Sequence, residues 1–73
     1  MSKLPQVSGL DVVSALQKLG FTVRRQHGSH IILRRDDPFA QTVVPNHRQI
    51  DRGTLRAILR QTDITADDLI KLL

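Results

Sequence analysis

Residues 21–45, FTVRRQHGSHIILRRDDPFAQTVVP, form the stretch that decides the fold. Three segments in it have the side-chain pattern of strands: Phe21–Gln26, Ile31–Arg35 and Gln41–Val44. A Gly-Ser pair separates the first two, an Asp-Asp-Pro break separates the last two, and Pro45 ends the third. Short connections of this kind join antiparallel neighbours. We therefore predict a three-stranded antiparallel sheet.

The connection between the first two strands sets which side chains lie opposite each other. A two-residue turn over residues 28–29 is allowed, but it would place Val23 opposite Arg34. A three-residue loop over residues 27–29 instead places Val23 opposite Leu33, so that two apolar side chains lie together. A shift of one residue moves every strand side chain to the other face, so the choice is all-or-none. We predict the three-residue loop.

This register assigns the side chains of the two strands to two faces. It places Arg25 opposite Ile31. The face toward the helices then contains Phe21, Val23, Ile31 and Leu33. The open face contains Arg24, Gln26, His30, Ile32 and Arg34. His30 is thus expected to be accessible to solvent, with Arg24 as its diagonal neighbour.

A helix is predicted before the strands. Ser8 is followed three residues later by Asp11, a short-armed variant of the capping box. The apolar residues after it recur with helical spacing, at Val12, Ala15, Leu16 and Leu19. Gly20 suits the left-handed position at which helices end.

Helical spacing returns from Asp51, where Leu55, Ile58 and Leu59 share one face. A short last helix is predicted to start at Thr65, with Asp68 at its third position, and to bury Leu69, Ile70 and Leu73. The expected order is α-β-β-β-α with a terminal helical turn or two, an α+β class in which the helices pack on one face of the sheet.

The composition limits the class of protein. A chain of 73 residues without repeats or linkers predicts one domain, residues 1–73. No apolar run approaches the roughly 18 residues of a membrane span, and the N-terminal segment lacks the apolar stretch of a signal peptide. The chain has no cysteine for disulfides or a thiolate zinc site. We expect a cytoplasmic protein that does not contact membranes.

The charge distribution indicates the kind of partner. The net charge is +4, and eight of the eleven basic residues are arginine, whose planar fork suits phosphate. Residues 24–35 contain four arginines and no acid. This favours nucleic acid or an acidic protein, although an ordinary solvated basic surface is also possible. Arg52, Arg56 and Arg60 likewise form either a phosphate-binding stripe or a solvated helix flank. Because tyrosine and tryptophan are absent, phosphate and shape contacts are favoured over base stacking.

Histidine is the candidate for chemistry. Imidazole commonly titrates near neutral pH, so it can accept and donate the protons that are exchanged when an RNA 2′-hydroxyl attacks the adjacent phosphate. His30 is the main candidate because it follows a turn and has arginine neighbours; the alternative is a plain surface histidine. His47 could approach the same face, and His27 is expected to be solvated. Three scattered histidines without cysteine or neighbouring acids make no recognisable metal site.

Four blocks of the sequence resemble the HicA-type toxins of bacterial and archaeal toxin–antitoxin pairs. In the order of the family they are Gly20-Phe21, QHGSH at residues 26–30, VPNH at residues 44–47 and GTLRAILRQ at residues 53–61. The resemblance implies a double-stranded-RNA-binding-like α-β-β-β-α fold, an mRNA interferase activity centred on the histidine of GSH, here His30, and a HicB-type antitoxin that masks the site. Family members often carry glycine where this chain has Asp63, and aspartate tolerates a left-handed cap better than most residues.

The resulting hypothesis is an α+β endoribonuclease toxin that cleaves mRNA with His30 as its catalytic acid or base and with no metal or other cofactor. The candidates for RNA contact are Arg24, Arg34, Gln26, Ser29 and His47. Two other interpretations stay open. One is a non-catalytic double-stranded-RNA-binding module, in which His30 only contacts the minor groove. The other is a protein-interaction domain whose basic face docks an acidic partner.

Overall fold

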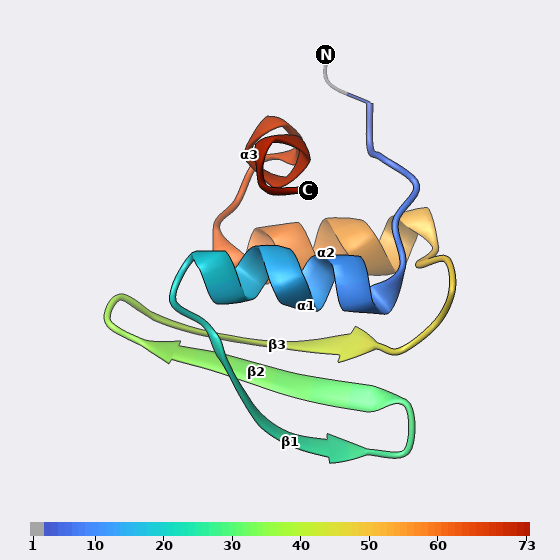
Figure 1. Ribbon diagram of the computed structural model, residues 1–73. Helices are drawn as coiled ribbons and strands as arrows, with labels where there is room; N and C mark the ends of the chain where they lie inside the picture. The colour runs from blue at the N-terminus through green and yellow to red at the C-terminus, as the bar shows by residue number, and fades with distance from the viewer. Residues whose placement is uncertain (1–2) are drawn as a thin grey trace.

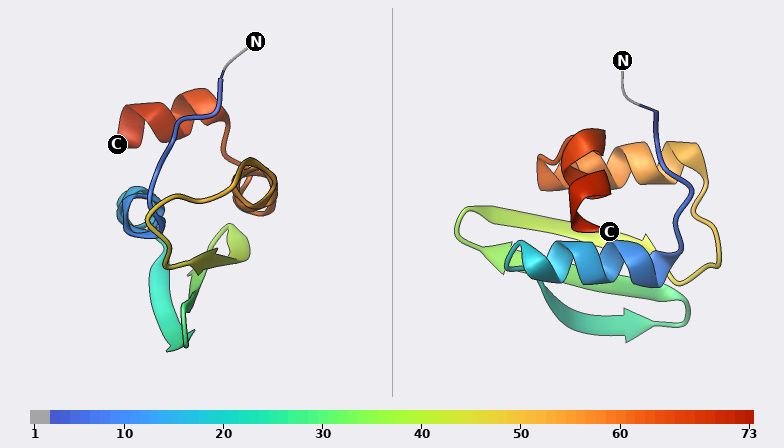
Figure 2. Two further views of the ribbon diagram at one scale, coloured as in Figure 1. Left: turned by 90° about the vertical axis from the view of Figure 1, so that its right-hand side faces the viewer. Right: turned by 45° about the horizontal axis from the view of Figure 1, so that its top comes forward.

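The computed structural model describes residues 3–73. Its elements are α1 (Gly9–Lys18), β1 (Thr22–His27), β2 (His30–Asp36), β3 (Phe39–Pro45), α2 (Arg52–Thr62) and α3 (Ala66–Leu72), as Figure 1 shows. The strands form one antiparallel sheet in the order β1-β2-β3. Helices α1 and α2 lie side by side on one face of this sheet, and α3 crosses them on the side away from it (Figure 2). No helix of the described residues covers the other face, so the predicted α+β class is confirmed.

The predicted helix starts are formed by local hydrogen bonds. The Ser8 hydroxyl accepts from the Asp11 N–H at 3.0 Å, and the Asp11 carboxylate accepts from the Ser8 N–H at 3.1 Å. Thr65 and Asp68 form the same capping box at α3. Both boxes satisfy backbone donors that the first turn of a helix leaves without intrahelical partners.

The second helix begins after Asp51, where the sequence predicts that helical spacing returns, and ends at Asp63. Asp51 is the N-cap of α2 and accepts from the hydroxyl and the N–H of Thr54 at 2.6 and 3.2 Å. These bonds, that from the Thr54 hydroxyl first, lower the pKa of Asp51 because they stabilise its charged form. Asp63 ends the helix in the left-handed conformation, with φ 58°. Gly20, after α1, has φ +92°.

The core lies between the sheet and the helices. Its fully buried members include Leu16, Leu33, Val44, Leu55 and Ile58. In α3 only part of the prediction holds, because Leu69 is buried whereas Ile70 and Leu73 are 45% and 54% exposed. Leu72, three residues after Leu69, packs against the core instead. A short helix turns one face inward, and residues three apart share that face whereas adjacent residues do not.

The turn between β1 and β2 differs from the prediction. His27 pairs with His30, so Gly28 and Ser29 alone make the connection. Gly28 has φ +57°, the left-handed value that a type II′ hairpin turn requires at its first central position. The predicted three-residue loop is therefore wrong.

A β-bulge reconciles the two-residue turn with the apolar pairing. Val23 pairs with Leu33, as predicted, but Arg25 pairs with Ile32 rather than with Ile31. Arg24 is the extra residue between them. Because a bulge shifts the pairing by one residue, side-chain alternation alone does not fix the loop length.

The bulge also changes the face on which Gln26 lies. Gln26 pairs with Ile31, whose side chain is buried toward the helices, and directly paired residues share a face. The predicted position of Gln26 on the open face is therefore wrong. Val23 is on the helix side, as predicted, yet it is 44% exposed because β1 is the strand farthest from the helices (Figure 1).

Candidate functional site

The open face presents its side chains in three rows that run across the strands. From the β1–β2 turn onward these rows are His27, His30 and Pro45; Arg25, Ile32 and Val43; and Thr22, Arg34 and Gln41. The first row is called the histidine row below. It lies at the end of the sheet formed by the turn, and the two other rows separate it from Asp36 at the opposite end.

His30 is the first residue of β2 and is exposed, as the sequence predicts. The tight turn fixes its place, because Gly28 supplies the left-handed backbone and the Gln26 side-chain amide donates to the Gly28 carbonyl at 2.9 Å. The diagonal neighbour of His30 is Arg25, since Arg25 pairs with Ile32. The prediction that Arg24 fills this position is wrong, although a guanidinium does lie there.

The loop after β3 is tied to the turn and to α1. The Asn46 N–H donates to the Ser29 carbonyl at 2.6 Å, and the Gly9 N–H donates to the His47 carbonyl at 2.8 Å. Ser29 thus contributes its backbone to the site, and its side chain is exposed. His47 is also exposed and lies two residues beyond Pro45, the cross-strand partner of His30.

Three arginines gather beside the histidine row. Arg24, Arg25 and Arg34 line a shallow depression of about 300 Å³, together with Ile32 and Gln41. The bulge is what brings both Arg24 and Arg25 to this depression, because adjacent residues of a regular strand point to opposite faces. The arrangement concentrates positive charge on an open surface, as a phosphate site requires.

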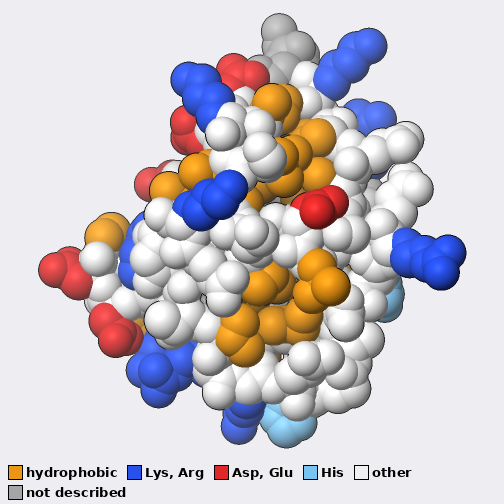
Figure 3. All heavy atoms as spheres, viewed as in Figure 1, with side chains coloured by type: hydrophobic (Ala, Val, Ile, Leu, Met, Phe, Trp, Pro, Cys, Tyr) orange, Lys and Arg blue, Asp and Glu red, His pale blue; other side chains and the backbone are white. Residues whose placement is uncertain are grey.

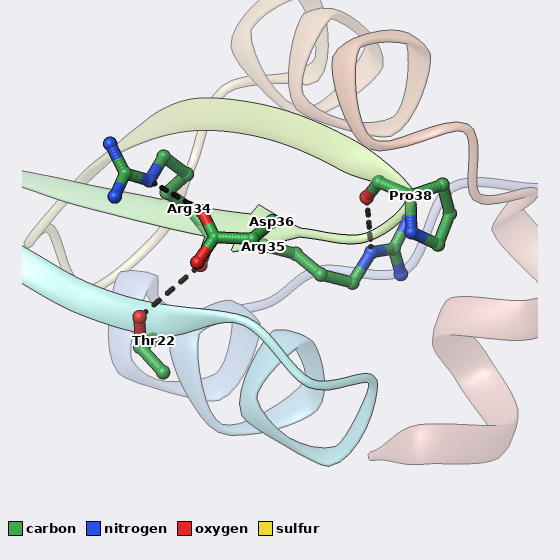
Figure 4. Close-up of polar contacts among 5 residues, drawn as sticks. All are labelled: Thr22, Arg34, Arg35, Asp36 and Pro38. Atoms are coloured by element: carbon green, nitrogen blue, oxygen red, sulfur yellow. Dashed lines mark hydrogen bonds and ion pairs between the residues drawn. The ribbon is translucent and has the colours of Figure 1, made fainter.

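Arg34 is held on the open face by its neighbours (Figure 4). Its Nε lies 3.0 Å from Asp36 Oδ1, and this contact is an ion pair without the alignment of a hydrogen bond. The Thr22 hydroxyl donates to the Arg34 carbonyl at 3.3 Å. Asp36 itself is largely exposed, so the pair orients Arg34 more than it stabilises the fold.

Arg35 has a structural role on the other face of the sheet. Its Nε donates to the Pro38 carbonyl at 2.9 Å (Figure 4), and its Nη1 donates to the Leu19 carbonyl at 3.3 Å. The guanidinium lies 4.6 Å from the centre of the Phe21 ring. These contacts join the β2–β3 turn to the end of α1, so this arginine does not belong to the basic surface of the open face.

Sequence reasoning missed Arg25 and His27 as members of the site. Both lie on the open face only because the turn has two residues and β1 carries a bulge. The Gly-Ser pair, a common two-residue hairpin signal, is the feature that could have revealed the register. Arg52, Arg56 and Arg60 are exposed on α2, on the other side of the sheet, and are not part of this site.

Charged side chains of both signs lie on the face seen in the space-filling view. Lys or Arg and His side chains lie at the lower margin, further Lys or Arg side chains lie at the upper left, the upper right and the right, and Asp side chains lie at the left, the upper left and near the centre (Figure 3). Within residues 3–73 there is no cluster of three or more potential metal ligands. No helix in the same range is long and apolar enough to span a membrane.

Comparison with known proteins identifies the family. The family model of the HicA toxin of bacterial toxin–antitoxin systems matches residues 9–64. The matched region extends from the start of α1 past the end of α2 and contains the histidine row and all three arginines of the depression. No curated protein matches the chain. Since most of its length fits the model, the chain belongs to the HicA family and is the toxin of a toxin–antitoxin system.

Proposed function

We propose that this toxin is an mRNA endoribonuclease and that His30 is its general acid or base. The observation that carries the proposal is the exposed imidazole of His30, fixed behind a tight turn and beside three arginines on an uncovered sheet. In the proposed reaction the RNA 2′-hydroxyl attacks the adjacent phosphate and the 5′-oxygen leaves. The step requires proton transfer and stabilisation of the phosphate charge, and imidazole and guanidinium supply both.

The arginines would position the RNA. A guanidinium fork binds two phosphate oxygens, and the depression lies in the rows next to His30. If the RNA backbone binds in the depression, its neighbouring phosphate would lie over the histidine row. Shape and phosphate contacts of this kind suit RNA recognition without stacking aromatics. Ser29 lies in the β1–β2 turn and His47 in the adjoining loop. Both would contact the same RNA strand at this end of the sheet.

Cleavage of RNA by the purified protein tests the proposal. The protein is incubated with a long transcript in the presence of a chelator, and the 3′ ends of the fragments are identified. The proposed reaction gives 2′,3′-cyclic phosphate ends and is insensitive to the chelator. Stable binding with intact RNA would instead favour the non-catalytic RNA-binding module, and absence of both binding and cleavage would favour the protein-interaction domain.

RNA affinity is expected to fall steeply with salt. If Arg24, Arg25 and Arg34 neutralise roughly three phosphates of a single strand, the slope of log affinity against log salt is about −2, or roughly a 20-fold loss between about 50 and about 200 mM. Arg25→Gln should reduce the slope by about 0.7, whereas Arg60→Gln on α2 should leave it unchanged. Gel shifts over a salt series measure this, and a flat response would exclude the depression as the RNA site.

A HicB-type antitoxin is the proposed protein partner. An acidic protein surface fits the basic open face and would cover His30 together with the arginines, which blocks RNA. Coexpression with the product of an adjacent small acidic reading frame should give a tight complex without cleavage activity, in the cytoplasm where mRNA is available. Replacing both Arg25 and Arg34 with Glu should weaken that complex. An isolated complex that still cleaves RNA would contradict masking of this face.

A further inference from the structure

We infer that His27 is the second proton-transfer group of this active site, acting with His30 as an acid–base pair. The inference rests on the proposed ribonuclease function and adds a second catalytic residue to it. It starts from the observed pairing of the strands, in which His27 and His30 are direct cross-strand partners.

The geometry places the two imidazoles on one surface. Directly paired residues point to the same face, with Cβ atoms roughly 5 Å apart. Both histidines are exposed, so substrate can reach both rings. The turn that joins them is held at two points, through the Gly28 carbonyl by Gln26 and through the Ser29 carbonyl by Asn46. A constrained pair of this kind can present two nitrogens to the two sides of one phosphate.

The proposed reaction has two proton transfers, and an imidazole can carry out each of them. One neutral imidazole takes the proton of the 2′-hydroxyl as its oxygen forms a bond to phosphorus. One protonated imidazole gives its proton to the 5′-oxygen as the P–O5′ bond breaks. The products are a 2′,3′-cyclic phosphate and a 5′-hydroxyl, and the protein ends with the two histidines in exchanged protonation states, which solvent restores. No other reactant is consumed.

Among residues 3–73, His27 is the titratable residue that pairs directly across the strands with His30. The charged and titratable groups near it on the open face are Arg25 on β1 and His30 on β2, whereas β3 contributes Pro45 to this row. Arginine keeps its proton in proteins and cannot transfer it. Asp36 lies at the far end of the sheet, paired with Phe39. The backbone of His47 is bonded to the start of α1, outside the histidine row.

The experiment compares His27→Ala with His27→Arg on two substrates. The wild-type rate of RNA cleavage should follow a bell-shaped pH profile, because one histidine must be neutral and the other protonated. His27→Ala should lower the cleavage rate by roughly 10²-fold or more. Its pH profile should also no longer fall on one of the two sides of the maximum. His27→Arg, which keeps the positive charge, should be as inactive, whereas a residue that only contacts phosphate would tolerate arginine.

A substrate with a 5′-sulfur leaving group separates the two roles, since a thiolate leaves without protonation. The variant that lacks the general acid, either His27→Ala or His30→Ala, should regain cleavage activity on this substrate. The variant that lacks the general base should stay inactive. If His27→Ala cleaves RNA at the wild-type rate, or if His27→Arg is active, His27 is not a proton-transfer group. His30 then remains the proposed catalytic group. If His30→Ala is fully active, the proposed function itself fails. Folding of each variant is checked by thermal unfolding.

Discussion

His30→Ala is expected to give a folded protein that binds RNA and does not cleave it. His30 is exposed on a sheet face that no helix of residues 3–73 covers, and it contributes nothing to the buried core. Its removal should change the free energy of unfolding by about 0.5 kcal/mol or less, as is usual for surface positions. Affinity for RNA should persist because the arginines provide most of the phosphate attraction.

Cleavage by this variant should fall by about 10²–10⁴-fold, which is the usual contribution of one general acid or base. In cells its induction should leave growth and transcript integrity unaffected, unlike induction of the wild type. Thermal unfolding, gel shifts and cleavage assays on one preparation measure the three properties together. Wild-type cleavage by a folded variant would rule out His30 as the catalytic group, and an unfolded variant would show that the open face is misassigned.

Gly9→Ala is expected to cause the largest loss of stability of any single methyl addition at a glycine of this chain. A β-carbon at Gly9 would collide with the Pro45 carbonyl oxygen and lie 3.0 Å from the Asn46 Cα. These are backbone atoms, which cannot rotate away, so α1 or the loop must shift. Overpacking of this kind costs about 1–3 kcal/mol. For a domain of this size the melting temperature falls by roughly 4–8 °C per kcal/mol.

Gly53→Ala is the matched control, since Gly53 also lies in the first turn of a helix. A β-carbon there would meet only the Asp51 Oδ2, at 3.4 Å, so the change should be neutral or stabilise by about 0.4–1 kcal/mol. Calorimetry of both variants gives the comparison. Equal melting temperatures would mean that the contact between α1 and the loop is dispensable.

A shift of the loop after β3 in Gly9→Ala should also weaken the hydrogen bond from the Asn46 N–H to the Ser29 carbonyl of the turn. RNA cleavage by Gly9→Ala should therefore be lower.

The features that the sequence predicts correctly are those determined over three or four residues. Ser8 with Asp11, Thr65 with Asp68, and the left-handed residue Gly20 each depend on bonds within one turn of chain. The resemblance to HicA toxins, which the family match over residues 9–64 confirms, likewise rests on short blocks of sequence and needs no knowledge of the register. Local chemistry of this kind is the same wherever the segment lies in the fold.

The features that the sequence does not predict depend on distant partners. The position of Gln26 and the membership of Arg25 and His27 in the open face follow from a bulge, and a bulge is defined by the opposite strand. The need for glycine at position 9 arises from Pro45, which is far away in the chain. In α3, the choice between Ile70 and Leu72 is made by the surface on which the helix rests.

The bulge at Arg24 has an evolutionary consequence. On both sides of it the pairing is regular, from Val23 with Leu33 on one side to His27 with His30 on the other. Deletion of this single codon would therefore leave the core strands and the turn in place and remove one guanidinium from the depression. If the depression binds RNA as proposed, this change in strand length would alter the affinity for RNA while the strand pairing and the turn are kept.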